Sequence, residues 1–376
     1  MTLVLETLSI RDFRNLSRID LSLPAGGLVI VGPNGHGKTN MLEAIHYLHI
    51  LRSVRGARDA DLVRFGAEGF HVAARARGGA FDDVRAGFVR GRKRKKVTLD
   101  GVECDRLADA FGALPSVMFS PRDVELVAGP PTERRRFLDI TLASTSRRYL
   151  TALQRYRAAL VRRNATLREV QRRGTSDGDG RVAMWEPALA AAGATLWCER
   201  VAWSRWAAPR LASLCTAIGE RQRVTLDYHS TLAIEDAQAG DEAHVRERLV
   251  EALARDRVQD LRRTLTHSGP HRDDLALKLG GRSLRSFGSA GQQRTCAIAL
   301  RLLERATLHD RTGRTPLVLL DDPFAELDAE RARQILAVLA DGEPGQTFLV
   351  VPRADDVPHA YTMLARHTIR EGVLDA

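Results

Sequence analysis

The stretch VGPNGHGKTN, at residues 31–40, has the residue types and spacing of a phosphate-binding loop. Gly32 and Gly37 enclose four residues and are followed by Lys38 and Thr39. In such loops backbone N–H groups surround the phosphates, lysine reaches the β- and γ-phosphates and the hydroxyl binds Mg²⁺. The chain has only five lysines among 57 basic residues, and a compact ammonium suits this position better than the planar fork of arginine. A glycine-rich turn that holds a lysine by chance is the alternative. The predicted ATP contacts are Gly32, Pro33, Asn34, Gly35, His36, Gly37, Lys38, Thr39 and Asn40, with His36 supplying only its backbone N–H.

A second stretch, PLVLLDD at residues 316–322, is an apolar run that ends in two carboxylates. It fits the Walker B strand of nucleotide-hydrolysing enzymes, in which the first Asp organises Mg²⁺ and the next acid activates water. We therefore predict Thr39 and Asp321 as metal ligands and Asp321 and Asp322 as catalytic residues. Asp322 is one methylene shorter than the glutamate of transporter ATPases, so a purely structural acid is the alternative role.

The elements around these residues predict an α/β protein. Apolar residues 28–31 form a short strand before the loop, and residues 40–45 begin a pattern of helical period. Residues 1–125 are mostly strand-like, whereas 126–256 have helical period, broken by a hairpin tip, GTSDGDG, at 174–180. After residue 262 strands return at 316–320 and 347–351, with helices at 290–307 and 329–340. Residues 1–125 alone cannot close a phosphate-loop sheet, so we predict an ATPase head made of 1–125 and 257–376, interrupted by a mainly helical arm.

Composition narrows the class of partner. The 376 residues are 44% hydrophobic, which is typical of globular chains, and the net charge of +10 favours nucleic acid first and an anionic membrane second. Arginine-rich composition can also reflect GC-rich coding. The four cysteines form no Cys-x-x-Cys pair, so neither zinc nor a disulfide framework is expected. No apolar run reaches 18 residues and no signal peptide is visible, which predicts a cytoplasmic protein without a membrane partner.

Two further segments resemble the signature and D-loop of ABC-type ATPases. FGSAGQQRT, at residues 287–295, opens the helix before the Walker B strand, and AELD, at residues 325–328, follows that strand. The resemblance implies a homodimer in which Ser289, Gly291, Gln292 and Asp328 contact the ATP of the opposite subunit. A helix N-terminus is a suitable site for the γ-phosphate. An ordinary N-cap is the alternative role of Ser289.

The order of motifs from residue 10 to 328 resembles that of the RecF family. The segments IRDFRNL (10–16), FSPRDVELVAGPPTERRRFLD (119–139), RRNATLR (162–168) and SGPHRDDL (268–275) carry this resemblance together with the loop, signature and Walker B segments. It implies ATP-dependent dimerisation on duplex DNA and at single-strand/double-strand junctions. It also implies cooperation with RecR and RecO, and delivery of RecA to gapped DNA during repair and replication restart.

The chain departs from the family pattern in ways that imply slow hydrolysis. Arg122 stands where the family has Glu, which leaves Asp123 as the candidate for a contact on the Mg²⁺ side. Ala290 replaces a more common polar residue, and the strand at 347–351 runs directly into Pro352 and not into a histidine.

DNA contacts are predicted at Arg92, Lys93, Arg94, Lys95 and Lys96. This basic run lacks the interleaved aromatic residues of a single-strand platform, so contact with duplex phosphates is the functional interpretation and a solvated strand edge the alternative. If the run has no such role, the arm arginines Arg134–Arg136 or Arg162 and Arg163 are the next candidates. His271 is expected to organise a turn and not to act as a base.

The sequence leaves two rival functions open. A transporter-type ATPase subunit would leave the arm and the basic surplus unexplained. A nucleic-acid-binding protein with ATP as a structural prop would not change its assembly state when ATP binds.

Overall fold

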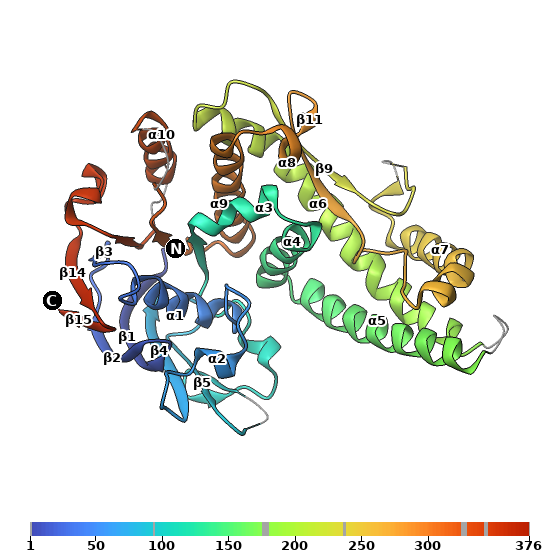
Figure 1. Cartoon of the computed structure of the whole chain (residues 1–376), viewed down its shortest axis with the longest axis horizontal. Helices are drawn as coiled ribbons and strands as arrows, with labels where there is room; N and C mark the ends of the chain where they lie inside the picture. Colours follow the sequence, from blue (N-terminus) through green and yellow to red (C-terminus); the bar gives the residue numbers. More distant parts are fainter. Residues whose placement is uncertain are drawn as a thin grey trace. The chain divides into compact units, whose positions relative to one another are not determined.

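The computed structural model describes most of the chain (Figure 1). The described residues are 2–92, 95–174, 180–235, 238–324, 329–341 and 345–375. Lys93, Arg94, the segment 325–328 with Asp328, and residues 175–179 of the predicted hairpin tip lie outside the described residues.

The chain divides into two compact units. The first comprises Met1–Val124, Leu214–Arg221 and Ala290–Ala376, and the second comprises Glu125–Ser213 and Gln222–Ser289. The α/β class and the head that is discontinuous in sequence are thus confirmed. The second unit runs on to Ser289, beyond the end of the arm expected at 256, because strand β10 (Asp274–Leu279) pairs antiparallel with β9 (Val224–His229) inside that unit.

A six-stranded, mostly parallel sheet contains the strands that lead into the glycine-rich loop and the Walker B carboxylates. Its order is β15 (Val373–Asp375), β14 (Ala365–Arg370), β3 (Gly27–Val31), β13 (Thr347–Val351), β12 (Leu317–Asp321) and β8 (Ser116–Phe119). All neighbours are parallel except β14 and β15. The prediction that C-terminal strands complete the sheet is confirmed, since β13 lies between β3 and β12. The four strands β3, β13, β12 and β8 are mostly apolar and buried because both faces of a parallel sheet are covered.

A second six-stranded sheet in the first unit is antiparallel. Its order is β2 (Leu16–Ser22), β1 (Val4–Phe13), β4 (Gly69–Arg77), β5 (Asp83–Val89), β6 (Lys96–Leu99) and β7 (Val102–Glu103). Buried and exposed residues alternate along β4, as expected for a sheet with one face toward a core.

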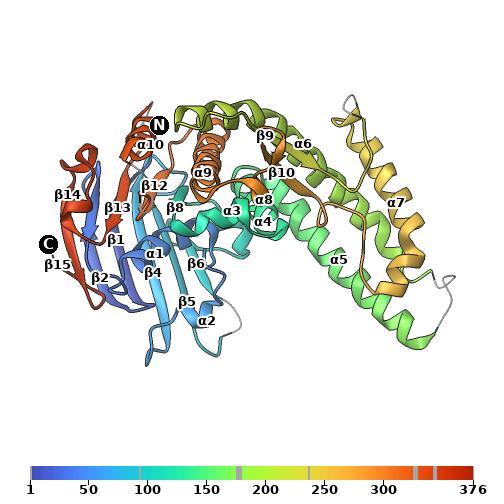
Figure 2. The same cartoon turned by 45° about the horizontal axis from the view of Figure 1, so that its top comes forward.

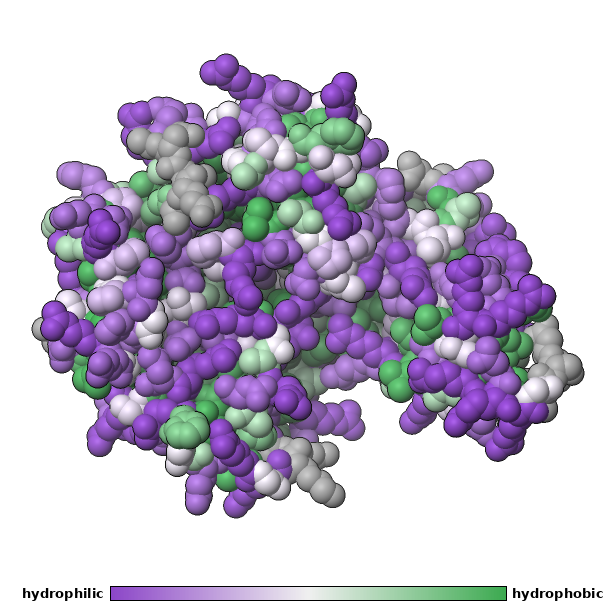
Figure 3. All heavy atoms as spheres, in the orientation of Figure 1, coloured by the Kyte–Doolittle hydropathy of each residue, from purple (hydrophilic) through white to green (hydrophobic). Residues whose placement is uncertain are grey.

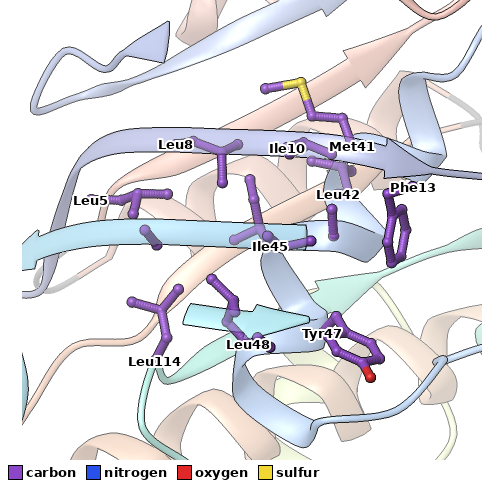
Figure 4. Close-up of a cluster of buried hydrophobic side chains, with 14 of the residues drawn as sticks. Leu5, Leu8, Ile10, Phe13, Met41, Leu42, Ile45, Tyr47, Leu48 and Leu114 are labelled. Carbon is purple, nitrogen blue, oxygen red and sulfur yellow. The ribbon is translucent and has the colours of Figure 1, made fainter. Parts of the chain in front are cut away.

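Helix α1 (Lys38–Ile50) packs against strands of both sheets, which is why nearly all of its residues are buried. Figure 4 shows side chains of β1 and α1 meeting in one apolar cluster. Its labelled members are Leu5, Leu8, Ile10, Phe13, Met41, Leu42, Ile45, Tyr47, Leu48 and Leu114. This packing holds the start of α1, and so the residues after the glycine-rich loop, in a fixed position. The other helices of this unit are α2 (Asp59–Leu62), α9 (Ala290–Thr312) and α10 (Ala329–Ala340).

The second unit is mainly helical. Its longer helices are α4 (Pro131–Thr145), α5 (Arg147–Arg173), α6 (Glu186–Ala217, which ends in the first unit) and α7 (Glu242–Arg263), with short helices α3 (Glu125–Ala128) and α8 (Leu284–Phe287). A small sheet, β11 (Arg282–Ser283), β10 and β9, completes it. Helices α5 and α6 run alongside each other in both views (Figures 1 and 2).

Hydrophilic side chains dominate the face drawn in Figure 3. Within the described part of the chain, no helix combines the length and apolar character that crossing a lipid bilayer requires.

Candidate nucleotide site

The glycine-rich loop connects the carboxyl end of β3 to the start of α1. Gly35 and Gly37 have φ angles of 85° and 110°, a region that glycine adopts without steric cost. A Cβ atom on Gly32 would lie 2.5 Å from the carbonyl oxygen of Ile369, so the neighbouring β14 leaves no room for a side chain there. The loop backbone therefore depends on glycine at each of these positions.

Lys38 is buried and its ammonium faces the loop. Its Nζ donates to the carbonyl oxygens of Gly32 at 2.5 Å and Pro33 at 2.9 Å, and lies 3.5 Å from Oδ1 of Asn34. Burial lowers the pKa of Lys38, and the charges of Asp321 and Asp322 oppose that shift. A cation held inside the loop near two carboxylates is suited to the phosphates of a nucleotide.

Thr39 and Asp321 meet although they come from opposite ends of the sequence. The hydroxyl of Thr39 donates to Oδ1 of Asp321 at 2.8 Å. Burial raises the pKa of Asp321, while the hydrogen bond from Thr39 and the charge of Arg55 oppose the shift. Mg²⁺ takes oxygen ligands from one or two protein groups plus phosphates and water, and this pair fits that requirement. Among the described residues, no group of three or more His, Cys, Asp or Glu side chains could hold a metal ion by itself.

Asp322 follows at the end of β12 in a left-handed backbone conformation. Its φ angle is 45°, and its N–H donates to the carbonyl oxygen of Val350 in the adjacent strand at 3.1 Å. The backbone of Asp322 is therefore held by β13, next to the Thr39–Asp321 pair.

The contacts of Asp123 argue against the role on the Mg²⁺ side for which it was the candidate. Its carboxylate accepts from the backbone N–H of Ser120 at 2.7 Å and forms an ion pair with Arg301 at 2.7 Å. The side chain is buried in these contacts, so it caps its own turn and is committed to Arg301 instead of a metal.

A polar network that we did not predict supports the loop through Asn40. The amide of Asn40 donates to Oδ1 of Asn15 at 2.8 Å and accepts from Arg55 at 2.8 Å. Arg14 forms two hydrogen bonds of 3.1 Å with the buried carboxylate of Glu43, which also lies 3.5 Å from Arg55. Arg14 and Asn15 belong to the segment IRDFRNL, whose polar residues were the available signal in the sequence.

His36 makes contacts beyond the predicted backbone N–H. Its Nδ1 accepts from the N–H of Glu371 at 3.1 Å, and its carbonyl oxygen accepts from the N–H of Gly372 at 3.0 Å. The turn between β14 and β15 thus supports the outer side of the loop. Nothing in the local sequence around His36 indicates this C-terminal contact.

The signature residues flank the start of α9. Ser289 is exposed and is the last residue of the second unit, and Gly291 and Gln292 lie in the first turn of α9 in the first unit. A Cβ on Gly291 would lie 2.5 Å from Nη1 of Arg331. The assignment of Ser289, Gly291 and Gln292 to the ATP of a second subunit stays a prediction. Asp328 lies outside the described residues.

The basic run is not uniformly available to DNA. The ammonium of Lys95 pairs with Asp59 at 2.8 Å, donates to the hydroxyl of Tyr47 at 3.0 Å and to the carbonyl oxygen of Leu51, and its side chain is only 10% exposed. Lys95 is therefore held inside the fold, which argues against it as a DNA contact, and contact of the rest of the run with duplex phosphates stays a prediction. Lys96 is exposed and pairs with Glu103 at 2.8 Å, and Arg92 is exposed.

Some of the alternative arm arginines are likewise committed inside the second unit. Arg134 pairs with Asp274 at 2.8 Å, and the fully buried Arg163 pairs with Asp260 at 2.6 Å and Glu186 at 3.1 Å. Neither Arg134 nor Arg163 is therefore presented to a DNA backbone.

His271 organises a turn, as predicted. Its Nε2 lies 3.0 Å from the carbonyl oxygen of Thr266 and its Nδ1 lies 2.6 Å from the hydroxyl of Tyr156. Burial lowers the pKa of His271 to about 4, so the ring is neutral near pH 7.

Comparisons with known proteins agree with this geometry. The family model described as "RecF/RecN/SMC N terminal domain" matches residues 4–373. The chain is 38% identical to the DNA replication and repair protein RecF of Roseiflexus castenholzii, covering 96% of each, and 32% identical to that of Bacillus velezensis, covering 94% of this chain and 95% of the relative. Among solved structures, the recombination mediator protein RecF with ATP superposes with a TM-score of 0.90 and 28% identity over 100% of this chain and 97% of the other. The Smc head of Pyrococcus furiosus, at 16% identity and a TM-score of 0.54, shares the fold alone.

Proposed function

Because the chain belongs to the RecF family, we propose that it is an ATP-dependent, DNA-binding recombination mediator. In this proposal ATP drives dimerisation, the dimer binds duplex or gapped DNA, and the complex helps to load RecA during repair and replication restart. The observation that carries the proposal is the hydrogen bond between Thr39 and Asp321 beside the buried Lys38, because this arrangement fits Mg²⁺ and nucleotide phosphates.

Each side chain has a distinct role in this proposal. Lys38 and the loop N–H groups bind the phosphates, while Thr39 and Asp321 offer oxygen ligands to Mg²⁺. Asp322 positions the attacking water and accepts its proton. Bound ATP supplies the phosphoryl group. Pro352, and not a histidine, directly follows β13, which supports slow hydrolysis that serves as a switch.

The dimer is proposed from the signature residues. Ser289, Gly291, Gln292 and Asp328 would contact the ATP of the partner subunit, so nucleotide would lie between two heads. Dimerisation doubles the number of basic side chains that act on one DNA at the same time. Linkage then requires DNA to favour the ATP-bound dimer by the same factor by which the dimer favours DNA.

The partners are proposed from the family. Solved relatives are described as acting in the RecFOR pathway, which supports RecR and RecO as protein partners of this chain. RecA would be reached indirectly, on gapped DNA in the cytoplasm. The positive net charge of +10 supports an acidic partner such as DNA.

The test is DNA binding by the purified chain, with and without ATP and Mg²⁺, on duplex, single-stranded and gapped substrates. We expect ATP to strengthen binding to duplex and gapped DNA and the Lys38→Met variant to lose this response. Sedimentation in the same buffers checks whether the ATP response coincides with dimerisation. The proposal would be contradicted if ATP changed neither the DNA binding nor the sedimentation of the wild-type protein.

A further inference from the structure

A groove of about 780 Å³ lies between α5 and α6 in the second unit. Its α5 side is basic, with Arg147, Arg148, Arg155 and Arg162 among the lining residues. All four arginines are exposed. None of the described residues that line the groove is among the predicted nucleotide contacts.

The positive charge along this groove is balanced only in part by the residues that line it. From Arg147 to Arg168, α5 contains no acidic residue. Among the described residues that line the groove, the only acid is Glu242, which pairs with Arg148 and accepts from the hydroxyl of Thr195 at 2.8 Å. Arg155, in the middle of the row, forms no hydrogen bond or ion pair with the residues that the structure describes. The surplus of cations therefore favours an acidic occupant.

The spacing of the arginines matches an α-helix. Arg148, Arg155 and Arg162 are separated by seven residues, or about 10.5 Å per step along the α5 axis at 1.5 Å per residue. A second helix with carboxylates at every seventh position presents negative charge at the same interval. The carboxylates of such a helix could form charge-assisted hydrogen bonds with the guanidinium groups of Arg155 and Arg162, while Arg148 already pairs with Glu242.

The floor of the groove consists of small residues. It is formed by Ala152 and Ala159 of α5 and by Ala188, Ala192 and Thr195 of α6. Short side chains let the backbone of a third helix come close to both, as in other complexes in which a helix lies in a groove.

Nucleic acid fits this groove less well. Reading the bases of duplex DNA requires a convex element that enters the major groove, and this concave surface offers none, so a duplex could meet only the outer arginines through its phosphates. A single strand needs aromatic faces on which its bases stack. The aromatic residue that lines the groove is Trp185. The guanidinium of Arg162 lies 5.4 Å from the centre of the Trp185 ring, and Nε1 of Trp185 donates to the hydroxyl of Thr166 at 3.1 Å.

We propose that the groove between α5 and α6 binds an acidic α-helix of a protein partner. The full chain is titrated with a fluorescent helical peptide of about three heptads that carries Glu at every seventh position and alanine on the same face. A peptide with Gln in place of these Glu residues is the matched probe, and duplex and single-stranded oligonucleotides are the nucleic-acid probes. We expect the Glu peptide to bind and the Gln peptide to bind about tenfold more weakly or worse.

Two kinds of variant test the site itself. Arg155→Glu with Arg162→Glu removes the charge match, and Ala188→Phe fills the exposed part of the floor without a charge change. Both should lose peptide binding, whereas Arg168→Glu, an exposed reversal on α5 outside the groove, should retain it. Unchanged ATP binding in all variants shows that the chain is folded. Equal binding of both peptides, or of wild type and both groove variants, overturns the proposal. It is also overturned if the arginine reversal weakens only oligonucleotide binding, because the groove would then be a nucleic-acid contact.

Discussion

The hydroxyl of Thr39 lies 2.8 Å from a carboxylate oxygen of Asp321, which is 282 residues away in the sequence. The contact arises because β3 and β12 point in the same direction in one sheet, separated by β13, so that their carboxyl ends meet at one edge. Open parallel sheets bind ligands at this edge. The two halves of the head therefore depend on each other for the site.

Replacement of Lys38 should weaken nucleotide binding itself. Lys38→Met removes the cation but keeps an apolar stem, so α1 retains its packing, and binding should fall by about ten- to a hundredfold. Lys38→Arg should also bind weakly, because the larger fork does not fit where Nζ contacts Gly32 and Pro33. Titration with a fluorescent ATP analogue measures this. Lys96→Met, a change at an exposed lysine, is the control, and equal loss in both variants would contradict the assignment.

The sequence predicted the parts of the site that depend on local spacing. The loop, the Walker B run and the strand at 347–351 could be recognised because glycine spacing and apolar runs report local backbone needs directly. The hydrogen bonds from Asn40 to Asn15 and from Glu371 to His36 could not be recognised in the sequence, because they depend on the side-by-side packing of distant segments. The pairing of Lys95 could not be recognised for the same reason, since its partner Asp59 lies on α2 and neighbouring residues do not indicate the pair.

The two carboxylates at the end of β12 should separate metal binding from hydrolysis. Asp321→Asn should reduce the Mg²⁺ dependence of ATP binding, because it removes the anionic oxygen beside Thr39. Asp322→Asn should bind ATP normally and hydrolyse it about a hundredfold more slowly, because the proton acceptor is lost.

Asparagine is chosen at residue 322 because it tolerates the left-handed conformation, here with φ of 45°. Filter binding and phosphate release measure the two steps. Normal ATP turnover by the Asp322→Asn variant would show that Asp322 has only a structural role.

Assembly should depend on Ser289. The protein should be largely monomeric without nucleotide and dimeric with ATP and Mg²⁺, and Ser289→Arg should retain ATP binding but lose the dimer because its side chain would fill the phosphate position. Ser286→Arg, at another exposed serine three residues earlier, is the matched control. Analytical ultracentrifugation measures the oligomeric state. Dimerisation of the Ser289→Arg variant at the wild-type level would contradict the proposal that ATP lies between two heads.

Stability should fall between pH 7.5 and pH 5 because of two buried histidines. Burial lowers the pKa of His49 and of His271 to about 4, from an ordinary value of 6.5. Between these two pKa values the unfolded chain binds protons that the folded chain does not. The contribution of the neutral histidines to the free energy of unfolding is therefore present above pH 6.5 and is lost as the pH falls toward 4. At pH 5 the loss is about 2 kcal/mol for each histidine.

Calorimetry at the two pH values checks this effect. His49→Gln and His271→Gln should each be less stable at pH 7.5 but lose less on acidification, whereas His229→Gln, at an exposed strand position, should behave as wild type. An identical pH response in all four proteins would show that other groups control the transition.

DNA binding should depend on salt through the basic run, but without Lys95. If Lys93 and Lys96 each contact one phosphate, a dimer makes four contacts and the log–log salt slope carries about −3.6 from them, at roughly −0.9 per phosphate. Lys93→Glu with Lys96→Glu should therefore flatten the slope and weaken all duplex sequences alike, because phosphate contacts carry no sequence information. Lys95→Gln should leave the slope unchanged and cost about 1–3 kcal/mol of stability, since it breaks a mostly buried pair with Asp59.

The measurement is a salt titration of duplex binding with ATP present. Lys278→Glu together with Arg168→Glu, at two positions of the second unit, lowers the net charge by the same four units as the double variant and is the control. A slope that the double variant leaves unchanged would mean that the run is a solvated strand edge. Exposed arginines such as Arg162 would then be the next contacts to test, because Arg134 and Arg163 are already held by carboxylates inside the second unit.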